Sequence, residues 1–527
     1  MSSLTRSGKS ISQDPSEIGQ WEILPYNSQV EAVHMALLHT GKVLYFSGFR
    51  VAEGAKTETR LWYPKIGEIK TPLTPGDIFC AGHSFLPDGR LLSTGGTLEY
   101  RGVPNIPPWL VRLLMPITST LVRIFGQYYQ GNLAVTGPTF LYLFDPKTEQ
   151  WEFVGDMEEG RWYPTSTTLP DGRILILSGS NEGHGFGSRG EIKMNRRVEV
   201  YSAEDGLQQV ATIPDTIPHF PSFYPRMHVL PLFGADKDLY PAGKAFCAGE
   251  GQDTKFLNLN TWEWTEVAAQ QFGDRHDGCS VLLPLRPPDY RAQVLVFGGV
   301  KDPDTDLTAT ETAEVIDFGK QPCTWELIDP LQDKRVNACA VILPDGNVLV
   351  AGGNNKGLFD NPVLNVEVFD SDQRKWRQVA PMNVPRGYHS VAILLPDARV
   401  VTGGTTPFDY HELRLEAYSP YYLFRGPRPK ITQVPASISY GQSFEVGFEQ
   451  VGSIQSIALI RPGAITHAFD MDQRYVSLNF HAAGIDRLIV EAPPDQHVAP
   501  PGYYMLFILS DQGVPSEAKF VQLAVQS

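Results

Sequence analysis

The sequence contains few cysteines and no long uncharged apolar run. Its 5 cysteines are scattered without a C-x-x-C pair, which argues against a zinc ribbon and against a dense disulfide framework. An odd number of cysteines leaves at least one thiol outside any disulfide. The apolar stretch 109–125 is interrupted by Arg112, Pro116 and Arg123, whereas a membrane-spanning helix needs about 20 nearly uncharged residues. We therefore expect no transmembrane segment.

Positive charge is also scarce. The chain carries 44 Lys plus Arg against 59 Asp plus Glu, a net charge of -15, and has no basic cluster. Because a nucleic-acid surface needs concentrated positive charge, nucleic acid is not an expected partner. The polar N-terminal tail, 1–19, lacks the apolar core of a secretory signal. This predicts a cytoplasmic location by default and leaves an extracytoplasmic location open.

Glycine and proline, by contrast, are abundant. The 527 residues include 48 Gly and 42 Pro, spread evenly along the chain. This distribution suits many short strands joined by tight turns. The length is sufficient for more than one hydrophobic core. We expect an all-β protein of at least two domains.

A repeat organises most of the chain. Each copy consists of an apolar run, a turn of the Pro-Asp-Gly type, a second apolar run and a small-residue stop. The seven copies end at Gly48, Gly96, Gly179, Gly243, Gly299, Gly353 and Gly404. Most intervals lie near the roughly 50 residues of a kelch blade, and the second repeat ends 83 residues before the third. This spacing indicates a propeller with one long insertion.

Each copy is typical of a β-hairpin, and a second pair of strands follows most copies, as at 141–154, 256–267 and 366–379. Four strands make one blade. The sequence therefore predicts a seven-bladed kelch-type β-propeller over residues 20–426. The segment 21–24 is expected to supply the outer strand of blade seven and so to close the ring.

Two regions depart from the repeat. The surplus at about 101–132 has helical character and is predicted to form a flap packed on the propeller; the alternative is a helix that docks on a membrane surface or a partner. Residues 427–527 alternate short strands with Pro/Gly turns. This second pattern predicts an immunoglobulin-like β-sandwich of the early-set kind.

The phase of the repeat singles out a ring of residues. The innermost strand of each blade lines the central channel of a propeller, so equivalent positions meet at one end of it. Counting seven residues back from the turn proline or its equivalent gives Ala32, Cys80, Tyr163, Tyr224, Asp277, Asn337 and His389. Singly, a buried Cys, Tyr or His is usually structural. Six polar or reactive residues on one ring predict a functional site.

Imidazole and phenol side chains on this ring favour a metal. Two imidazoles with phenolate oxygens form a tetragonal site that suits Cu(II). His389 lies on the ring and Tyr388 directly precedes it, and His467 occupies a turn of the C-terminal sandwich that we expect to reach the channel. A zinc alternative rests on Cys80 and His83, but no second ligand pair follows this C-x-x-H spacing.

Five motifs carry a family resemblance. They are DIFCAGHSFLPDGR (77–90), GRWYPTSTTLPDGR (160–173), PRGYHSVAILLPD (385–397), ITHAFDMDQR (465–474) and PPGYYMLFIL (500–509). In this order they resemble the copper radical oxidases, the family of galactose oxidase and glyoxal oxidase, over the chain from about Trp21. The R-W-Y-P form around Tyr163 is similar to the glyoxal oxidase branch.

The resemblance implies a thioether between Cys80 and Tyr163, and one copper ion held by Tyr163, Tyr388, His389 and His467. It also implies a protein-derived radical cofactor, the one-electron-oxidised Tyr163. Tyr388 would take the proton of a copper-bound substrate, and the Tyr163 radical would take hydrogen from its carbon. Oxygen would restore the enzyme and leave as hydrogen peroxide. The implied substrate is a primary alcohol or a small aldehyde of the glyoxal type.

The sequence departs from galactose oxidase in two respects. Galactose oxidase begins with a carbohydrate-binding β-domain, for which this sequence has no room before the first blade. Galactose oxidase also has a Trp that stacks on the cross-linked Tyr, and this sequence has Asn181 at the matching position. Trp109, on the insertion, is the predicted replacement that shields the radical. The predicted substrate-binding residues are Tyr224, Arg226, Asp277 and Asn337. A catalytically silent kelch propeller that binds a protein or glycan is the alternative function.

Overall fold

The computed structural model is almost entirely β, as predicted. It describes residues 13–47, 58–97, 99–101, 134–184, 193–217, 220–232, 234, 236–303, 305–357, 360–405, 412–449 and 452–525. Its helices in these ranges are single turns: α1 (Pro15–Ile18), α4 (Asp236–Leu239) and the 3-10 turn η2 (Tyr421–Phe424). None of the described helices has the length and apolar character to span a membrane. The predicted helical flap at 101–132 and Trp109 lie outside the described residues.

Within these ranges, seven sheets each contain one sequence repeat, and we number these blades in chain order. The fourth repeat is longer than predicted, because Gly243 lies before its second strand and does not end it. The strands of the first four, from the channel outward, are β2 (His34–Leu37), β3 (Val43–Phe46), β4 (Thr59–Tyr63) and β5 (Glu68–Lys70); β6 (Gly82–Phe85), β7 (Leu91–Thr94), β10 (Phe140–Asp145) and β11 (Gln150–Asp156); β12 (Thr165–Thr168), β13 (Ile174–Leu177), β16 (Arg197–Ser202) and β17 (Gly206–Thr212); and β18 (Met227–Leu230), β19 (Lys244–Cys247), β20 (Asp253–Asn258) and β21 (Trp264–Ala269).

The remaining three blades follow the same order. Their strands are β22 (Cys279–Leu282), β23 (Gln293–Phe297), β26 (Ala313–Asp317) and β27 (Trp325–Ile328); β28 (Cys339–Ile342), β29 (Val348–Ala351), β32 (Val366–Asp370) and β33 (Lys375–Val379); and β34 (Ser390–Leu394), β35 (Val400–Gly404), β36 (Arg414–Ser419) and β1 (Gln20–Asn27). β1 pairs antiparallel with β36, Trp21 opposite Tyr418. The predicted contribution of the N-terminal strand to blade 7 is confirmed.

The turns and the inner strands explain how the repeat folds. Gly89, Gly172 and Gly346 of the Pro-Asp-Gly turns have φ values of +87°, +86° and +83°, a region that costs a residue with a Cβ about 1–2 kcal/mol. The innermost strands are buried along their whole length, as in β6 and β12, whereas the outer strands alternate toward solvent. The hydrophobic core therefore lies between neighbouring blades around the channel.

Buried arginines brace the segments that lead into the inner strands. Arg161 pairs with Glu199 at 2.7 Å, Arg275 with Glu314 at 2.7 Å, and Arg335 with Glu367 at 3.0 Å. All six side chains are almost completely inaccessible. A buried charge is tolerated only when it is paired and hydrogen-bonded. Each pair therefore fixes the chain two residues before a ring position.

Two small accessory sheets extend the blades. They consist of β8 (Glu99–Arg101), β9 (Ala134–Thr136), β14 (Ser180–His184) and β15 (Lys193–Met194), and of β24 (Val300–Asp302), β25 (Asp306–Ala309), β30 (Asn354–Lys356) and β31 (Asp360–Pro362). Single bridges tie β14 to Trp162, β24 to His276 and β30 to Val336. Each bridging residue directly precedes a ring residue, so these sheets lie at the ring end of the channel.

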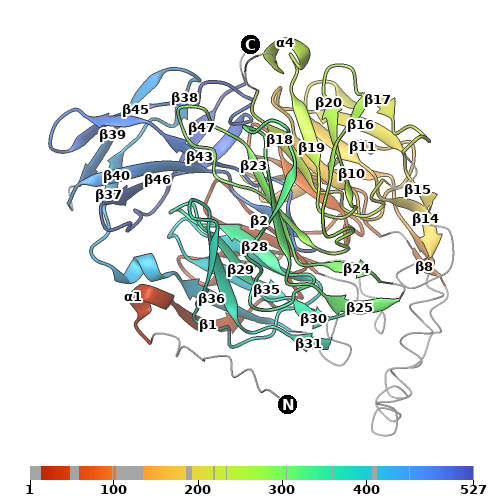
Figure 1. The fold of residues 1–527 in the computed structure, drawn as a ribbon, viewed down its shortest axis with the longest axis horizontal. Coiled ribbons are helices and arrows are strands. Elements are labelled where there is room, and N and C mark those ends of the chain that lie inside the picture. The colour runs from red at the N-terminus through yellow and green to blue at the C-terminus, as the bar shows by residue number, and fades with distance from the viewer. Residues whose placement is uncertain are drawn as a thin grey trace, which may run out of the picture.

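The C-terminal strands form a β-sandwich beside the propeller (Figure 1). Its sheets contain β37 (Lys430–Gln433), β39 (Ser443–Glu449), β45 (Arg487–Glu491) and β44 (Phe480–Ala482), and β38 (Ser437–Ile438), β47 (Lys519–Leu523), β46 (Gly502–Ser510), β40 (Ile454–Ile460) and β43 (Tyr475–Leu478). One apolar cluster joins its residues, such as Ile457 and Leu459, to Leu282 and Phe246 of the propeller. The two parts thus share a core.

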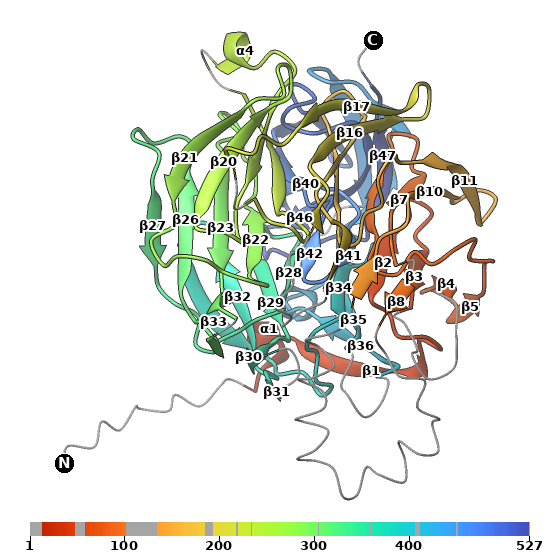
Figure 2. The ribbon, with the colours of Figure 1, turned by 90° about the vertical axis from the view of Figure 1, so that its right-hand side faces the viewer.

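One hairpin leaves the sandwich and enters the ring of blades. β41 (Ala464–Thr466) pairs with β2, and β42 (Phe469–Asp470) pairs with β41, so blade 1 gains two strands on its channel side. Figure 2 shows this hairpin at the centre of the propeller. His467 lies in its turn. The expectation that this segment reaches the channel is confirmed.

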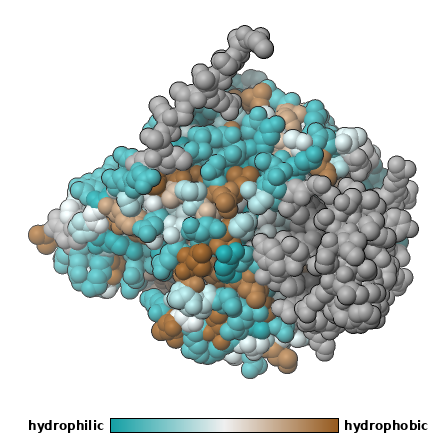
Figure 3. All heavy atoms as spheres, turned by 90° about the horizontal axis from the view of Figure 1, so that it is seen from below, coloured by the Kyte–Doolittle hydropathy of each residue, from teal (hydrophilic) through white to brown (hydrophobic). Residues whose placement is uncertain are grey.

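The described part of the surface carries no large apolar patch in the view of Figure 3, where hydrophobic groups are separated by hydrophilic ones. The exposed large apolar side chains, among them Leu73, Phe153 and Ile485, come from different blades and from the sandwich. Scattered apolar residues are normal on a globular surface. The candidate functional site therefore lies in the channel.

Candidate metal centre

The ring predicted from the repeat phase is present in the structure and has a common backbone conformation. Six of its seven members have a left-handed φ, between +40° and +65°; they are Cys80, Tyr163, Tyr224, Asp277, Asn337 and His389. The amide of Tyr163 donates to the carbonyl of Cys80 at 3.0 Å, and the amide of Tyr224 donates to that of Tyr163 at 2.8 Å. Neighbouring ring residues are thus joined blade to blade. Left-handed non-glycine residues are uncommon and cluster at functional sites.

Two phenols and an imidazole meet at the centre of the ring. The hydroxyl groups of Tyr163 and Tyr388 form a short hydrogen bond, although 225 residues separate them. Nε2 of His467 lies 3.0 Å from the Tyr163 oxygen. All three side chains are buried. Three oxygen and nitrogen donors therefore share one small volume.

His389 and Cys80 complete the cluster. The rings of His389 and His467 have centroids 4.7 Å apart and stand nearly perpendicular, at 86°. The potential ligand atoms of Cys80, His389 and His467 lie within 4.8 Å of one another. Within the described ranges, His83 is absent from any such group of three. The structure therefore groups Cys80 with the two histidines of the copper prediction, and the C-x-x-H zinc alternative is not supported.

Burial dominates the acid–base properties of these groups. It raises the pKa of Tyr163 and of Tyr388 well above the ordinary value, and lowers the pKa of His389 to about 3 and that of His467 well below its usual range. Both imidazoles are therefore neutral at physiological pH, which metal ligation requires. A bound divalent cation reverses the effect on the phenols, because it stabilises phenolate.

The donor set fits copper. Two neutral imidazoles and two phenolic oxygens are borderline and hard donors of the type that Cu(II) prefers in tetragonal geometry. The four groups converge although they come from blades 3 and 7 and from the β41–β42 turn. Without a cation, the close Tyr163–Tyr388 contact needs a proton between the oxygens. A metal between these donors would replace that proton.

The turn that carries His467 is held on both sides. Thr466 Oγ1 lies 2.6 Å from Nδ1 of His467, and it donates to the carbonyl of Val33 at 3.2 Å. Arg226 donates to the carbonyl of His467 at 3.4 Å. A partner on the second ring nitrogen fixes the tautomer of a metal-binding histidine. Nε2 of His467 is thereby directed at the tyrosines.

The base of the same hairpin is anchored by a buried ion pair. Arg461 and Asp472 lie 2.9 Å apart, and both are almost inaccessible. Asp472 also accepts hydrogen bonds from Ser84 and Thr168, both at 3.0 Å. These residues stand on the inner strands of blades 2 and 3. The sandwich loop is therefore tied to the blades that carry Cys80 and Tyr163.

Aromatic rings cover both faces of Tyr163. Trp162 stacks on it with centroids 4.0 Å apart and an interplanar angle of 16°, and Tyr224 stacks at 4.6 Å and 25°. Sequence reasoning named Asn181 and Trp109 for this place. Asn181 is directed elsewhere, since its amide donates to Glu159 at 3.5 Å. Trp162 was missed because it directly precedes Tyr163, and adjacent residues rarely stack.

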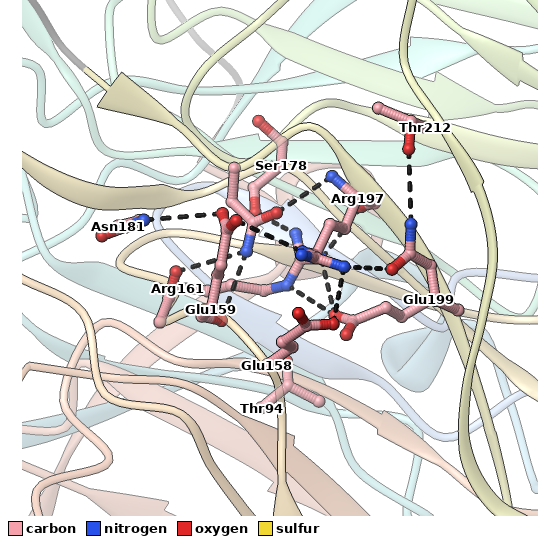
Figure 4. Close-up of polar contacts among 12 residues, drawn as sticks. Thr94, Glu158, Glu159, Arg161, Ser178, Asn181, Arg197, Glu199 and Thr212 are labelled. Atoms are coloured by element: carbon pink, nitrogen blue, oxygen red, sulfur yellow. Dashed lines mark hydrogen bonds and ion pairs between the residues drawn. The ribbon is translucent and has the colours of Figure 1, made fainter.

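Hydrogen bonds and ion pairs around Arg161 fix the segment that precedes Tyr163 in the sequence (Figure 4). The guanidinium of Arg161 donates to Glu199, to the carbonyl of Ser178 and to the carbonyl of Arg197. Arg197 in turn pairs with Glu158 at 2.7 Å. The backbone directly before Trp162 and Tyr163 is therefore held in place.

The four predicted substrate-binding residues differ in burial and in hydrogen bonding. Tyr224 is buried and its hydroxyl donates to the carbonyl of Ala81 at 3.2 Å, and Arg226 is 2% exposed. Asp277 is partly exposed, and the Nδ2 group of Asn337 is buried without a hydrogen-bond partner among the described residues. Asp277 and Asn337 are adjacent on the ring, since the Asn337 amide donates to the Asp277 carbonyl at 3.0 Å.

Glu250 belongs to this corner as well, and sequence reasoning missed it. It lies 3.1 Å from Arg226, and it accepts a hydrogen bond of 3.3 Å from the amide of Asp277. Burial raises the pKa of Glu250 to about 7 and also raises the pKa of Asp277. The sequence offered no signal for Glu250, because it follows the stop of the fourth repeat and not the ring position.

The fold and the site define a class: a kelch-type propeller whose channel receives a histidine-bearing loop from an early-set sandwich. The family model for the galactose oxidase-like early-set domain matches residues 428–523, and that for the glyoxal oxidase N-terminus matches 263–422. A fungal alcohol oxidase of the AA5 family, solved in complex with copper, has the same fold, with a TM-score of 0.77 and 24% identity over 96% of this chain and 100% of that one.

Curated relatives agree with these matches. The aldehyde oxidase GLOX of Vitis pseudoreticulata is 28% identical over 96% of this chain and 97% of its own length. Galactose oxidase of Gibberella zeae is 27% identical over 92% of this chain and 67% of its own length. The chain is therefore similar to the copper radical oxidases, the group of galactose oxidase and glyoxal oxidase, in both of its matched domains.

Proposed function

We propose that this protein is a copper-dependent oxidase that converts a primary alcohol or a small aldehyde, with O2, into the aldehyde or carboxylic acid and hydrogen peroxide. The observation that carries the proposal is the convergence of Cys80, Tyr163, Tyr388, His389 and His467 at one buried point. A propeller that serves only as a binding scaffold needs none of these five. The names of the oxidase relatives support the same class of reaction.

Tyr163, Tyr388, His389 and His467 would hold the copper. When bound, copper supplies a Lewis acid that lowers the pKa of a substrate hydroxyl, and it accepts one electron. Tyr388 is the proton acceptor of the site, because its oxygen already exchanges a hydrogen bond with Tyr163 in the closed volume. Burial raises the pKa of its phenol, and a bound cation would lower it and so make Tyr388 a phenolate that can take a proton.

Tyr163 is the second redox centre in this proposal. Its ring lies between Trp162 and Tyr224, away from water, and beside the thiol of Cys80 in one buried cluster. A thioether to Cys80 and the flanking rings would delocalise and protect an oxidised phenol. Copper would accept one electron of the substrate and the oxidised Tyr163 the other, so that a two-electron oxidation would need no organic cofactor.

The substrate is predicted to bind at Asp277, which is partly exposed, and at Asn337, whose buried Nδ2 group has no hydrogen-bond partner among the described residues. An alcohol or the hydrate of an aldehyde carries the hydroxyl groups that such a corner can hydrogen-bond. The R-W-Y-P segment and the glyoxal oxidase match favour aldehydes of the glyoxal type.

The test begins with the copper-free protein. Cu(II) is added under air, and the intact mass and peptide map are followed. We expect the peptides of Cys80 and Tyr163 to become joined with the loss of two hydrogens. Cys80→Ser abolishes the link, whereas Cys339→Ser, at another buried cysteine, leaves it intact. A panel of alcohols and aldehydes then gives peroxide. Failure to bind copper, or binding without either link or peroxide, contradicts the proposal.

A further inference from the structure

The site contains a histidine that none of its assigned roles uses. His34 lies on β2, has no exposed surface, and stacks on Phe46 with centroids 4.3 Å apart. Its Nε2 accepts a hydrogen bond of 3.0 Å from the backbone amide of Cys80. The contact joins residues 46 positions apart, on blades 1 and 2. His34 therefore touches the backbone of the cysteine that the proposed thioether requires.

This contact takes the place of a backbone hydrogen bond that three other ring residues make. The amides of Tyr163, Tyr224 and Asn337 each donate to the carbonyl of the preceding ring residue. Between blades 1 and 2 that pattern is interrupted, because β41 pairs with the channel edge of β2 and contacts β6. The amide of Cys80 finds the imidazole of His34 instead of a carbonyl of blade 1.

Cys80 needs such a partner. Its φ of +64° is left-handed, which costs a non-glycine residue about 1–2 kcal/mol. A buried amide without a partner costs about 1–3 kcal/mol more. The hydrogen bond that this amide donates to His34 removes the second of these costs in the observed conformation. The direction of the Cys80 side chain is set by the same conformation.

His34 also connects Cys80 to the loop of His467. In the pairing of β2 with β41, His34 stands opposite Thr466. Thr466 makes the 2.6 Å hydrogen bond to Nδ1 of His467. One residue of blade 1 therefore sets the position of the cysteine through its side chain and of the histidine loop through its backbone.

We propose that His34 is a positioning residue for thioether formation: it holds the backbone of Cys80 so that Sγ faces the ring of Tyr163. This inference rests on the proposed function. In the reaction the S–H bond of Cys80 and a ring C–H bond of Tyr163 break, and a C–S bond forms. O2 takes the two electrons and two protons and leaves as hydrogen peroxide. His34 is unchanged.

Three variants isolate the hydrogen bond. His34→Phe keeps a flat ring against Phe46 and removes the acceptor, and His34→Gln restores an acceptor oxygen. His83→Phe is the matched control, because His83 is equally inaccessible and lies 5.3 Å from His34 between ring centroids. Its two ring nitrogens make no hydrogen bond within the described part of the chain. Hydrogen exchange of the copper-free proteins reports on the amide of Cys80. Intact mass after addition of copper and O2 reports on the thioether.

We expect His34→Phe to exchange one additional amide rapidly in the peptide that contains Cys80. We also expect it to form the thioether roughly 10- to 100-fold more slowly, the usual effect of about 1 Å of misplacement. Copper stoichiometry stays at that of the wild type. His34→Gln recovers most of the rate, and His83→Phe matches the wild type in both measurements.

Other results overturn the inference in recognisable ways. Unchanged exchange in His34→Phe shows that the hydrogen bond does not hold Cys80. A wild-type rate of cross-linking in His34→Phe, or equal loss in His83→Phe, reduces His34 to a packing residue. If the wild type itself binds copper and forms no thioether, the oxidase proposal fails, and this inference fails with it.

Discussion

The backbone amide of Tyr163 donates a 3.0 Å hydrogen bond to the carbonyl of Cys80, so the two residues lie side by side on neighbouring blades. They are separated by 83 residues of sequence, including the long insertion. Because the bond joins main-chain groups at the same repeat position, no choice of side chain is needed to bring them together. The propeller itself creates the pair, and the cysteine and tyrosine make the pair reactive.

Thr466→Val tests the support of His467. Valine keeps the shape of threonine and removes the hydroxyl that lies 2.6 Å from Nδ1. Loss of such a partner usually weakens metal binding about 10- to 100-fold. We expect this loss in a competition titration with Cu(II), and near wild-type affinity for Thr466→Ser. Equal affinity for the valine variant would show that the tautomer of His467 is set by another group.

Tyr388→Phe removes the proposed proton acceptor. Three protein donors to copper remain, so the variant should bind copper with weaker affinity and still form the thioether. The loss of one general base typically lowers kcat/KM about 10²- to 10⁴-fold. Steady-state peroxide production at saturating copper measures this. Activity within a few-fold of the wild type would assign the proton to a different residue.

Trp162→Leu exposes one face of Tyr163. The indole stacks at 4.0 Å on that ring, and we expect its removal to shorten the lifetime of the oxidised phenol by at least about 10-fold, since each 10-fold corresponds to about 1.4 kcal/mol of lost stabilisation. The decay of the radical absorbance gives the lifetime, and mass spectrometry shows whether the thioether is retained. Trp162→Phe, which keeps a stacked ring, should decay nearly as slowly as the wild type.

Arg161→Met tests the brace beneath the tyrosine. Removing one partner of a buried ion pair costs about 3–5 kcal/mol, and Arg161 and Glu199 are both almost inaccessible. We expect a decrease of this size in the free energy of unfolding by urea, part of which returns in Arg161→Met with Glu199→Leu. The exposed pair Arg173 and Asp171 is the control: Arg173→Met should cost at most about 1 kcal/mol.

His228→Gln tests the linkage between burial and pH. Burial lowers the pKa of His228 to about 3, against 6.5 for a free histidine. Between these values only the unfolded chain binds the proton, so the stability due to the neutral ring is present above pH 6.5 and is lost as the pH falls toward 3. Removing the group should flatten the pH dependence of the unfolding free energy by roughly 1.4 kcal/mol per unit.

The comparison of wild type and His228→Gln between pH 6.5 and 4.5 is the measurement. It separates His228 from Glu250 and Asp470, whose pKa values are raised to about 7 by burial. These two carboxyl groups make the folded protein more stable as the pH falls below 7, because the folded state binds their protons at a higher pH than the unfolded chain does. Parallel pH curves for the two proteins would show that His228 has the same pKa in the folded and the unfolded state.

Most of the fold could be predicted from the sequence, because each repeat carries its own signals. The apolar runs and the turn glycines such as Gly89 and Gly172 are local, and they define hairpins wherever they occur. The channel ring followed from the same phase. The closure of blade 7 by β1 was also predictable, since a sheet edge without a partner needs a strand.

The side-chain contacts around the ring could not be predicted from the sequence. The stacking of Trp162 on Tyr163 depends on the left-handed φ of Tyr163, which turns two adjacent side chains to the same side. The place of Glu250 depends on the side chain of Arg226 and on the amide of Asp277. Sequence reasoning therefore placed the shielding role on Asn181 and Trp109.

The sequence by itself determined the blades, the ring positions and the residues proposed as metal donors, because these repeat with a fixed phase or stand in recognisable motifs. Only the tertiary structure decided how the side chains of these residues are oriented toward one another. That depends on one hairpin, β41–β42, which enters the channel, pairs with β2 and brings His467 to Tyr163. Hydrogen bonds between segments hundreds of residues apart have no local signal, since they exist only after the blades have closed.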